Sequence, residues 1–345
     1  MKFTSVGNVV DLVASTGLDA LLVDLAAYIE ADFARWPAFE KAPRYASHSS
    51  EGVIELMPTS DGEQFAFKYV NGHPRNFERG LQTVCAFGVL SDVATGYPVL
   101  VSEMTILTAL RTAATSAIVA RRLARPESQR MAIIGLGSQS EFQAHAFRAL
   151  MGIRALRVFD IDPAATAKFL RNLENAGFDI TVARTVEEAV AGADIVTTVT
   201  ADKRQAVILS DNLVGAGVHL NAVGGDCPGK TELQAAILRR ASVFVEFEPQ
   251  TRIEGEIQQM PADYPVTEFW QVITGVHPGR RSSAEVTVFD SVGFAMEDFS
   301  VLRFIADRVE GTAFYSDIDI LTEPDDPRDL FGLLLPKRIT EEAAA

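Results

Sequence analysis

The sequence predicts an α/β protein that combines a doubly wound parallel sheet with a second, α+β unit built on an antiparallel sheet. Between residues 131 and 290, short apolar runs alternate with helical patterns, which is typical of parallel strands joined by crossover helices. Before residue 104, strand-like runs follow one another through turn sequences, which indicates an antiparallel meander. The parallel sheet is therefore expected to follow the antiparallel one along the chain.

The stretch 131–160, MAIIGLGSQSEFQAHAFRALMGIRALRVFD, has the layout of a dinucleotide-binding, or Rossmann, unit. It begins with a short apolar strand pattern, and Gly135 and Gly137 follow at once. A helical pattern comes next, and a second apolar run closes on Asp160. This order of strand, glycine turn, helix, strand and acid predicts a cofactor site.

Each of these residues has a physical role in such a site. Gly135 permits the tight turn, Gly137 lets a pyrophosphate approach the backbone, and the helix N-terminus offers free N–H groups to the phosphates. Asp160 can accept hydrogen bonds from a ribose diol and would repel a 2′-phosphate, which favours NAD over NADP. Ser140 stands where the usual fingerprint has a third glycine, so an ordinary strand–helix turn is the alternative interpretation.

Length and composition predict a globular protein of two domains. The 345 residues can bury a large core, and 48% apolar and 22% charged residues are ordinary proportions. A net charge of −15 argues against nucleic acid and against an anionic membrane as partners. The sequence has no signal-peptide core and no run of membrane-spanning length, so we expect a cytoplasmic protein. The five histidines and two cysteines lack metal-ligand spacing, so no metal site is expected.

The first 125 residues are expected to hold helices followed by the meander. Apolar spacing predicts two helices within 7–36, divided at Gly17, and turn chemistry at 59–62 predicts a hairpin. Strands are expected at 44–49, 53–57, 65–70, 83–90 and 97–103. The run 106–123 is crowded with Ala, Thr and Ser, which indicates a helix packed closely against a backbone or a ligand.

From residue 126 onward, strands and helices alternate. Asp162 and Pro163 are placed to cap and begin the helix after Asp160. Further strands are expected at 180–183, 195–199, 218–223, 243–247 and 286–289, and further helices at 185–192, 233–240 and 294–309. We therefore expect a first domain over 1–125 and a second over 126–311, with the acidic tail 312–345 packing back on the first.

Ligands of doubly wound sheets lie beyond the carboxyl ends of the strands. The residues expected there are Gly135–Gln139, Asp160, Thr200, Asn221–Asp226 and Ser291. Asp226 is the most informative, because in NAVGGDCPGKTEL it follows two glycines after a central strand, with Lys230 four residues later. A helix cap or a surface turn acid is the alternative interpretation of Asp226.

Three cations in the first domain form a second group of candidates. Arg44 begins a strand, Lys68 lies inside an aromatic strand, and Arg111 interrupts the small-residue helix. Singly, each is typical of a solvated surface residue. Together they could clamp a carboxylate, and Glu55 on the neighbouring strand could hold an ammonium group.

Several of these stretches resemble the ornithine cyclodeaminase and mu-crystallin family. The resemblance covers nearly the whole chain and rests on RTAATSA (111–117), FKYVNGHP (67–74), GLGSQSEFQ, NAVGGDCPGKTEL and VFDSVG. It implies a homodimer in which the first domains bind the substrate and pair their sheets, while the second, Rossmann domains bind NAD. The missing third glycine is normal for this family.

The resemblance also implies roles for individual residues. Arg44, Lys68 and Arg111 would bind the substrate carboxylate, Asp226 would be the catalytic acid and base, and Val292 would touch the substrate. Cofactor contacts would come from Thr83, Arg111, Gly135, Gly137, Ser138, Gln139, Asp160, Thr200, Asn221, Ala222, Val223, Gly224, Lys230 and Ser291.

Three functions remain open at this point. The first is conversion of L-ornithine to L-proline and ammonia, through transient NAD-mediated oxidation at Cα, ring closure by the δ-amine and return of the hydride. The second is a net oxidoreductase on the same scaffold, a ketimine reductase or an amino-acid dehydrogenase. The third is a non-catalytic binding protein of the crystallin kind, against which the presence of Asp226 argues. The choice of ornithine over lysine rests on the resemblance alone.

Overall fold

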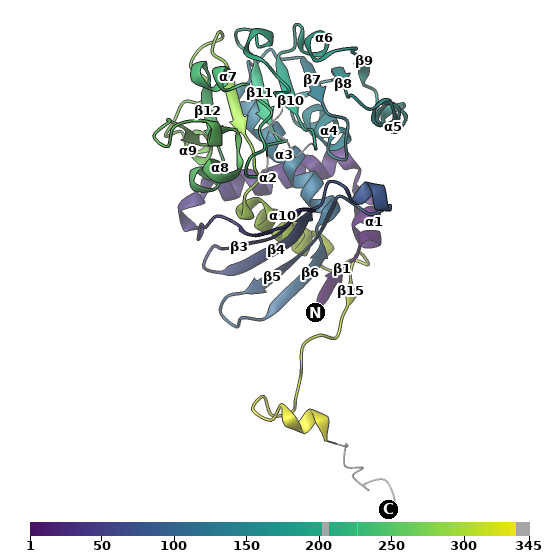
Figure 1. The fold of residues 1–345 in the computed structure, drawn as a ribbon. Coiled ribbons are helices and arrows are strands. Elements are labelled where there is room, and N and C mark those ends of the chain that lie inside the picture. Colours follow the sequence, from purple (N-terminus) through teal and green to yellow (C-terminus); the bar gives the residue numbers. More distant parts are fainter. Residues whose placement is uncertain (202–206, 226, 336–345) are drawn as a thin grey trace, which may run out of the picture.

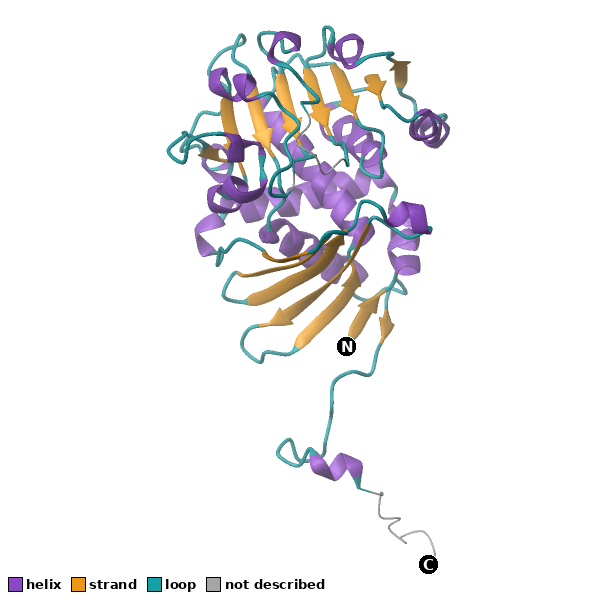
Figure 2. Ribbon diagram, viewed as in Figure 1, coloured by secondary structure: helices purple, strands orange, loops and turns teal. Residues whose placement is uncertain are grey.

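Two sheets with a layer of helices between them form the structure, a computed structural model that describes residues 1–201, 207–225 and 227–335 (Figures 1 and 2). The first sheet has the strand order β15-β1-β6-β5-β4-β3-β2. Its strands are β1 (Lys2–Thr4), β2 (Tyr45–His48), β3 (Val53–Ser60), β4 (Gln64–Gly72), β5 (Val84–Asp92), β6 (Pro98–Glu103) and β15 (Ser316–Asp317). The predicted antiparallel meander corresponds to β2–β6. The short edge strands β1 and β15 were not predicted.

Helices cover one face of this first sheet. They are α1 (Val6–Thr16), α2 (Leu18–Ala34), α3 (Thr105–Leu123) and α10 (Ala295–Val309). Gly17, with φ +84°, separates α1 from α2, as predicted. Helix α2 buries Leu22, Leu25 and Ile29 completely, because these apolar residues recur on one side of the helix. Among the described residues no single helix is long and apolar enough to cross a membrane, although α1 and α2, bent by 104°, reach that length and composition together.

The opposite face of the first sheet is apolar and uncovered by any described element. Side chains alternate between the two faces of each strand, so β3 buries every second residue of its first six. The outward positions include Tyr45, Ile54, Leu56 and Phe87, each at least 40% exposed. The sheet therefore has one face packed on helices and one face that is free in the single chain.

The second sheet is entirely parallel, with the order β13-β12-β14-β11-β10-β7-β8-β9. Its strands are β7 (Arg130–Ile134), β8 (Ala155–Phe159), β9 (Asp179–Val182), β10 (Ile195–Thr198), β11 (His219–Ala222), β12 (Ser242–Val245), β13 (Thr267–Glu268) and β14 (Thr287–Asp290). The predicted helices are α4 (Ser140–Met151), α5 (Pro163–Leu173), α6 (Val186–Val190) and α7 (Ala235–Arg240). The doubly wound prediction is confirmed. The unpredicted segment between β12 and β14 holds α8 (Glu248–Glu254) and α9 (Trp270–Ile273) in addition to β13.

The packing differs from the expected domain boundaries in two places. Helix α10 lies against β3, β4 and β5 and against α2, so it belongs to the first sheet although residues up to 311 were assigned to the second domain. The reason is its buried apolar side, which includes Phe299 and Leu302. In the tail, β15 pairs with β1 and Ile318 bonds to the backbone of Met1, but residues 319–335 extend away from the body instead of packing back (Figure 1).

Gly135 is held in a backbone conformation that other residues rarely adopt. Its φ is +97°, and a Cβ built there would lie 2.9 Å from the carbonyl carbon and oxygen of Val199. We expect Gly135→Ala to lower the free energy of unfolding by about 1–3 kcal/mol, measured by urea denaturation. Gly137→Ala is the matched control, because a Cβ there meets no described atom within 4 Å. Equal stability of the two variants would contradict this account of the turn.

Candidate functional site

A cavity of about 300 Å³ lies between the two sheets. It is bounded by the loops that follow β7, β10, β11 and β14, at the carboxyl ends of the parallel strands, and by β3, β4 and α3 of the first unit. Fourteen of the residues predicted to form the site line it: Arg44, Glu55, Lys68, Thr83, Arg111, Gly137, Ser138, Gln139, Thr200, Val223, Gly224, Lys230, Ser291 and Val292. The fold thus brings the predicted cofactor and substrate groups together in one place.

Four predicted cofactor residues that the structure describes do not line the cavity: Gly135, Asp160, Asn221 and Ala222. Asn221 and Ala222 are fully buried in β11. The Asn221 amide donates to Thr197 Oγ1 at 3.3 Å, and its Oδ1 lies 3.2 Å from His219 Nε2. Burial lowers the pKa of His219 to about 3, so this imidazole is neutral. Asn221 therefore joins neighbouring strands inside the sheet.

Asp226, the predicted catalytic residue, lies outside the described residues. The residues that precede and follow it in the chain can be placed. Gly224 and Cys227 both line the cavity. A Cβ at Gly224 would lie 2.1 Å from Glu232 Oε1, so only glycine fits there above the buried Glu232.

The glycine turn after β7 fits a dinucleotide. Helix α4 begins at Ser140 without a side-chain cap among the described residues, and Gly137 to Gln139, which precede it, line the cavity, so the backbone N–H groups of its first turn lie beside the cavity. Gln139 Oε1 is buried there and has no hydrogen-bond partner in the described part of the chain. Asp160 stands beside the turn, where its carboxylate accepts from the backbone N–H of Leu136 at 2.6 Å. This is the position from which a carboxylate can reach the ribose of a bound dinucleotide.

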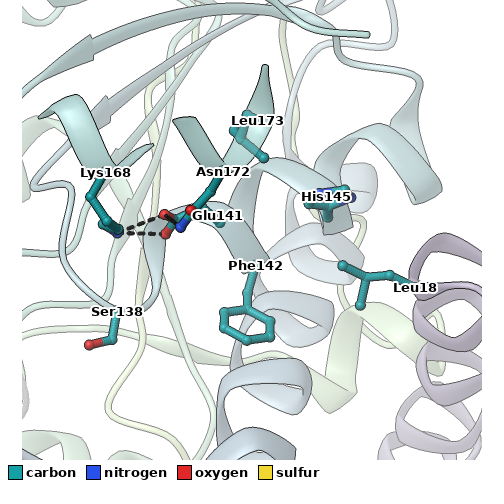
Figure 3. A pocket seen from close by; sticks show the side chains of 8 residues that line it. All are labelled: Leu18, Ser138, Glu141, Phe142, His145, Lys168, Asn172 and Leu173. Carbon is teal, nitrogen blue, oxygen red and sulfur yellow. Dashed lines mark hydrogen bonds and ion pairs between the residues drawn. The ribbon is translucent and has the colours of Figure 1, made fainter. Parts of the chain in front are cut away.

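A second hollow, of about 340 Å³, lies on the other side of the same turn (Figure 3). Lys168 on α5 donates to the carbonyl oxygen of Gly137 at 2.9 Å and pairs with Glu141 at 2.7 Å. Asn172 donates to Glu141 Oε1 at 2.8 Å. Helix α5 therefore holds the glycine turn from outside the cavity. Sequence reasoning missed these contacts, because Lys168 and Asn172 look like ordinary solvated helix residues.

Lys68 and Arg111 meet at one buried carboxylate. Asp298 Oδ1 accepts from Lys68 Nζ at 2.8 Å and from Arg111 Nε at 3.0 Å, while Arg111 Nη1 pairs with Glu297 at 2.6 Å. Burial lowers the pKa of Lys68 to about 8 and raises the pKa of Glu297 to about 8. The group therefore places two cations beside two buried carboxyl groups, of which Glu297 holds its proton more readily than an exposed glutamate.

Arg44 connects the two units. Its guanidinium pairs with Glu55 on β3 and with Glu254 on α8, each at 3.1 Å, and donates to the carbonyl oxygen of Val292 at 2.6 Å. Glu246, at the end of β12, accepts from Ser291 Oγ at 2.8 Å. Burial raises the pKa of Glu246.

Sequence reasoning missed the acids that hold the predicted cations. They are Glu254, Glu297 and Asp298, and all three lie more than 180 residues from the cations they pair with. The segments EPQTRIEGEIQQ and MEDF contain them, but local spacing does not reveal a partner so distant in the chain.

Comparisons with known proteins identify the family. A model of the ornithine cyclodeaminase/mu-crystallin family matches residues 6–313. The chain is 63% identical over 335 residues to the ornithine cyclodeaminase of Brucella suis biovar 1, which covers 97% of this chain and 94% of the relative.

Two solved structures support the same assignment. A lysine cyclodeaminase, studied for its recognition of L-lysine, L-ornithine and L-2,4-diaminobutyric acid, is 31% identical with a TM-score of 0.90 over 96% of this chain and 99% of its own. An archaeal alanine dehydrogenase dimer with bound NAD is 29% identical with a TM-score of 0.85 over 93% of this chain and 99% of its own. The resemblance drawn from the sequence motifs is confirmed, and the chain belongs to the ornithine cyclodeaminase/mu-crystallin family.

Proposed function

We propose that this chain is an NAD-dependent ornithine cyclodeaminase, an ammonia-lyase that converts L-ornithine to L-proline and ammonia without net oxidation. The observation that carries the proposal is 63% identity to the Brucella enzyme across 97% of the chain. The cavity supports it, because one end is suited to a dinucleotide and the other holds buried cations suited to an amino-acid carboxylate.

The cofactor would lie across the carboxyl ends of the parallel strands. The backbone around Gly137 and the N-terminus of α4 would bind the pyrophosphate, and Asp160 would bind the adenosine ribose. Lys230, whose Nζ donates to the carbonyl oxygen of Thr200 at 2.9 Å, would fix the loop beneath it. Bound NAD would supply a hydride acceptor, and then a hydride donor, for the substrate Cα.

The substrate carboxylate would bind at the buried cations. Lys68 and Arg111 place two cations at the cavity, and burial raises the pKa of Glu297, which weakens its opposition to an added anion. A substrate carboxylate would bind beside these cations in a site where water competes poorly. Arg44 would provide a further donor to the same group.

Asp226 would make the ring closure possible. The δ-amine of ornithine resembles that of lysine, with a pKa of about 10.4, so in water it is protonated and cannot attack Cα. Asp226 would take this proton inside the enclosed site, where desolvation raises the pKa of a carboxyl and lowers that of an amine. Glu55, which lines the cavity, would help to hold the ammonium before transfer.

The uncovered apolar face of the first sheet would pair with the same face of a second copy. Tyr45, Ile54, Leu56 and Phe87 are too exposed for a chain that works alone. The archaeal alanine dehydrogenase neighbour is itself a dimer. We therefore propose a homodimer in which two first units meet through their sheets.

The proposed reaction is tested with L-ornithine and a trace of NAD. We expect proline and ammonia in equal amounts with no accumulation of NADH, whereas stoichiometric turnover of the nicotinamide would identify an amino-acid dehydrogenase instead.

Asp226→Asn should bind NAD normally and lose at least about 100-fold in kcat. The exposed Asp263→Asn is the matched control and should be fully active. If Asp226→Asn formed proline at the native rate, Asp226 would be only a surface turn residue, and Glu55 would be the next candidate for the proton acceptor.

Cofactor choice should depend on Asp160. We expect the native protein to use NAD and to bind NADP poorly, because the Asp160 carboxylate repels a 2′-phosphate. Asp160→Ser combined with Ile161→Arg, at a side chain that is 91% exposed, should improve kcat/KM with NADP by at least about 10-fold. Ile161→Arg alone is the control and should keep the native preference. Equal use of NAD and NADP by the native protein would refute the proposal that Asp160 lies beside the adenosine ribose.

Lys68 should govern substrate affinity. Lys68→Met removes one charge-assisted partner of the carboxylate, so binding of L-ornithine should weaken by about 2–5 kcal/mol, measured as KM, with NAD affinity unchanged. The native KM should also rise as pH passes about 8, where Lys68 loses its proton, and Lys68→Met should lack this component. Lys68→Met/Asp298→Asn also removes the carboxylate that has lost one of its two cationic partners, and so separates lost affinity from lost stability. An unchanged KM in Lys68→Met would rule out the clamp.

A further inference from the structure

The chain leaves its own body after β15. This strand pairs antiparallel with β1, with Asp317 opposite Lys2 at the edge of the first sheet. After Ile318, which bonds to the backbone of Met1, residues 319–335 project outward and include a short 3-10 helix near their end, η5 (Phe331–Leu334) (Figure 1). These residues 319–335 are here called the C-terminal arm. The arm thus begins at the edge of the sheet whose outer face is uncovered.

The end of the arm is apolar and exposed. Leu330 is 59% exposed, Phe331 69% and Leu334 76%, and Leu333 and Leu335 are also exposed. Contiguous large apolar side chains of this kind are rare on the surface of a monomer and mark a binding surface. The preceding part of the arm carries four acids, Asp319, Glu323, Asp325 and Asp326, beside Ile320 and Leu321, and separates the apolar end from the body.

The arm lies beyond the family model but mostly within the part of the chain that related cyclodeaminases match. The family model ends at residue 313, which leaves 32 of the 345 residues beyond it. The alignment with the Brucella enzyme covers 97% of the chain, so only about 10 residues lie outside it and most of the arm lies within it. The lysine cyclodeaminase structure likewise covers 96% of the chain.

We propose that the C-terminal arm docks on a second copy of this chain and locks the homodimer. A second copy is the occupant that the structure favours, because the arm begins at the edge of the very face proposed for dimerisation. Each arm of a symmetric dimer then buries its leucines and Phe331 against the other protomer, outside the sheet-to-sheet contact. The arm adds a second contact to the dimer proposed above, but the activity assay with L-ornithine tests the reaction independently of it.

The first test compares two triple variants of the full chain by sedimentation equilibrium. Leu330→Ser/Phe331→Ser/Leu334→Ser should raise the dimer dissociation constant at least about 100-fold, because three buried apolar side chains are lost on each arm. Leu170→Ser/Val182→Ser/Val276→Ser is the matched control, at exposed apolar residues of the second unit, and should leave the constant unchanged. An unchanged constant in the arm variant, or a native chain that is monomeric, would overturn the proposal.

The second test identifies what the arm touches. A photoreactive benzoylphenylalanine in place of Phe331 should give, on irradiation of the purified protein, a denatured band of twice the chain mass. Only cross-links within one chain would mean that the arm folds back on its own body, which overturns the proposal. The absence of any protein cross-link from the purified dimer would also overturn it, because the arm would then contact no part of the second copy.

Discussion

The buried carboxylate of Asp298 is the contact on which the packing of the first unit, and with it one wall of the cavity, depends. It accepts hydrogen bonds from Lys68 on β4 and from Arg111 on α3, so one oxygen fixes two cations at the wall of the cavity. Buried charges of either sign are strongly destabilising when one partner is removed. Helix α10, which carries Asp298, must therefore pack on the first sheet although it follows the last strand of the second sheet in the chain.

The dinucleotide end of the cavity is held from two sides in a comparable way. On one side Gly135 lies against the backbone of Val199, at a distance that leaves no room for a side chain. On the other side Lys168 binds the carbonyl oxygen of Gly137 and pairs with Glu141. Because backbone N–H groups can bind phosphates only in one conformation of the turn, this external support belongs to the binding site as much as the glycines do.

Local patterns predicted the features that local physics determines. Period-two and helical spacing predicted the meander and the alternating strands and helices of the second unit, and the glycines with Asp160 predicted the turn after β7. All of these features depend on residues that are close in sequence. Local patterns could not predict the acids that pair with the cations, because these partners are distant in the chain; Lys68 and Asp298, for example, are 230 residues apart. Asn221 is buried in β11 and does not line the cavity; a strand-end position predicts a ligand but does not show which way the side chain points. The edge strands β1 and β15 are too short to give a pattern of their own.

The first unit is discontinuous in the chain, and this explains where the site lies. Its sheet needs β1 from the start of the chain and β15 from near the end, and its helical layer needs α10, so the second unit is inserted between α3 and α10. The two crossings run from α3 to β7 and from β14 to α10, and the loop between β14 and α10, residues 291–293, lines the cavity. Arg44 fastens that loop by its bond to the carbonyl oxygen of Val292. The groups for cofactor and substrate are thus joined by covalent connections as well as by ion pairs, and the cavity can form only when both units have folded.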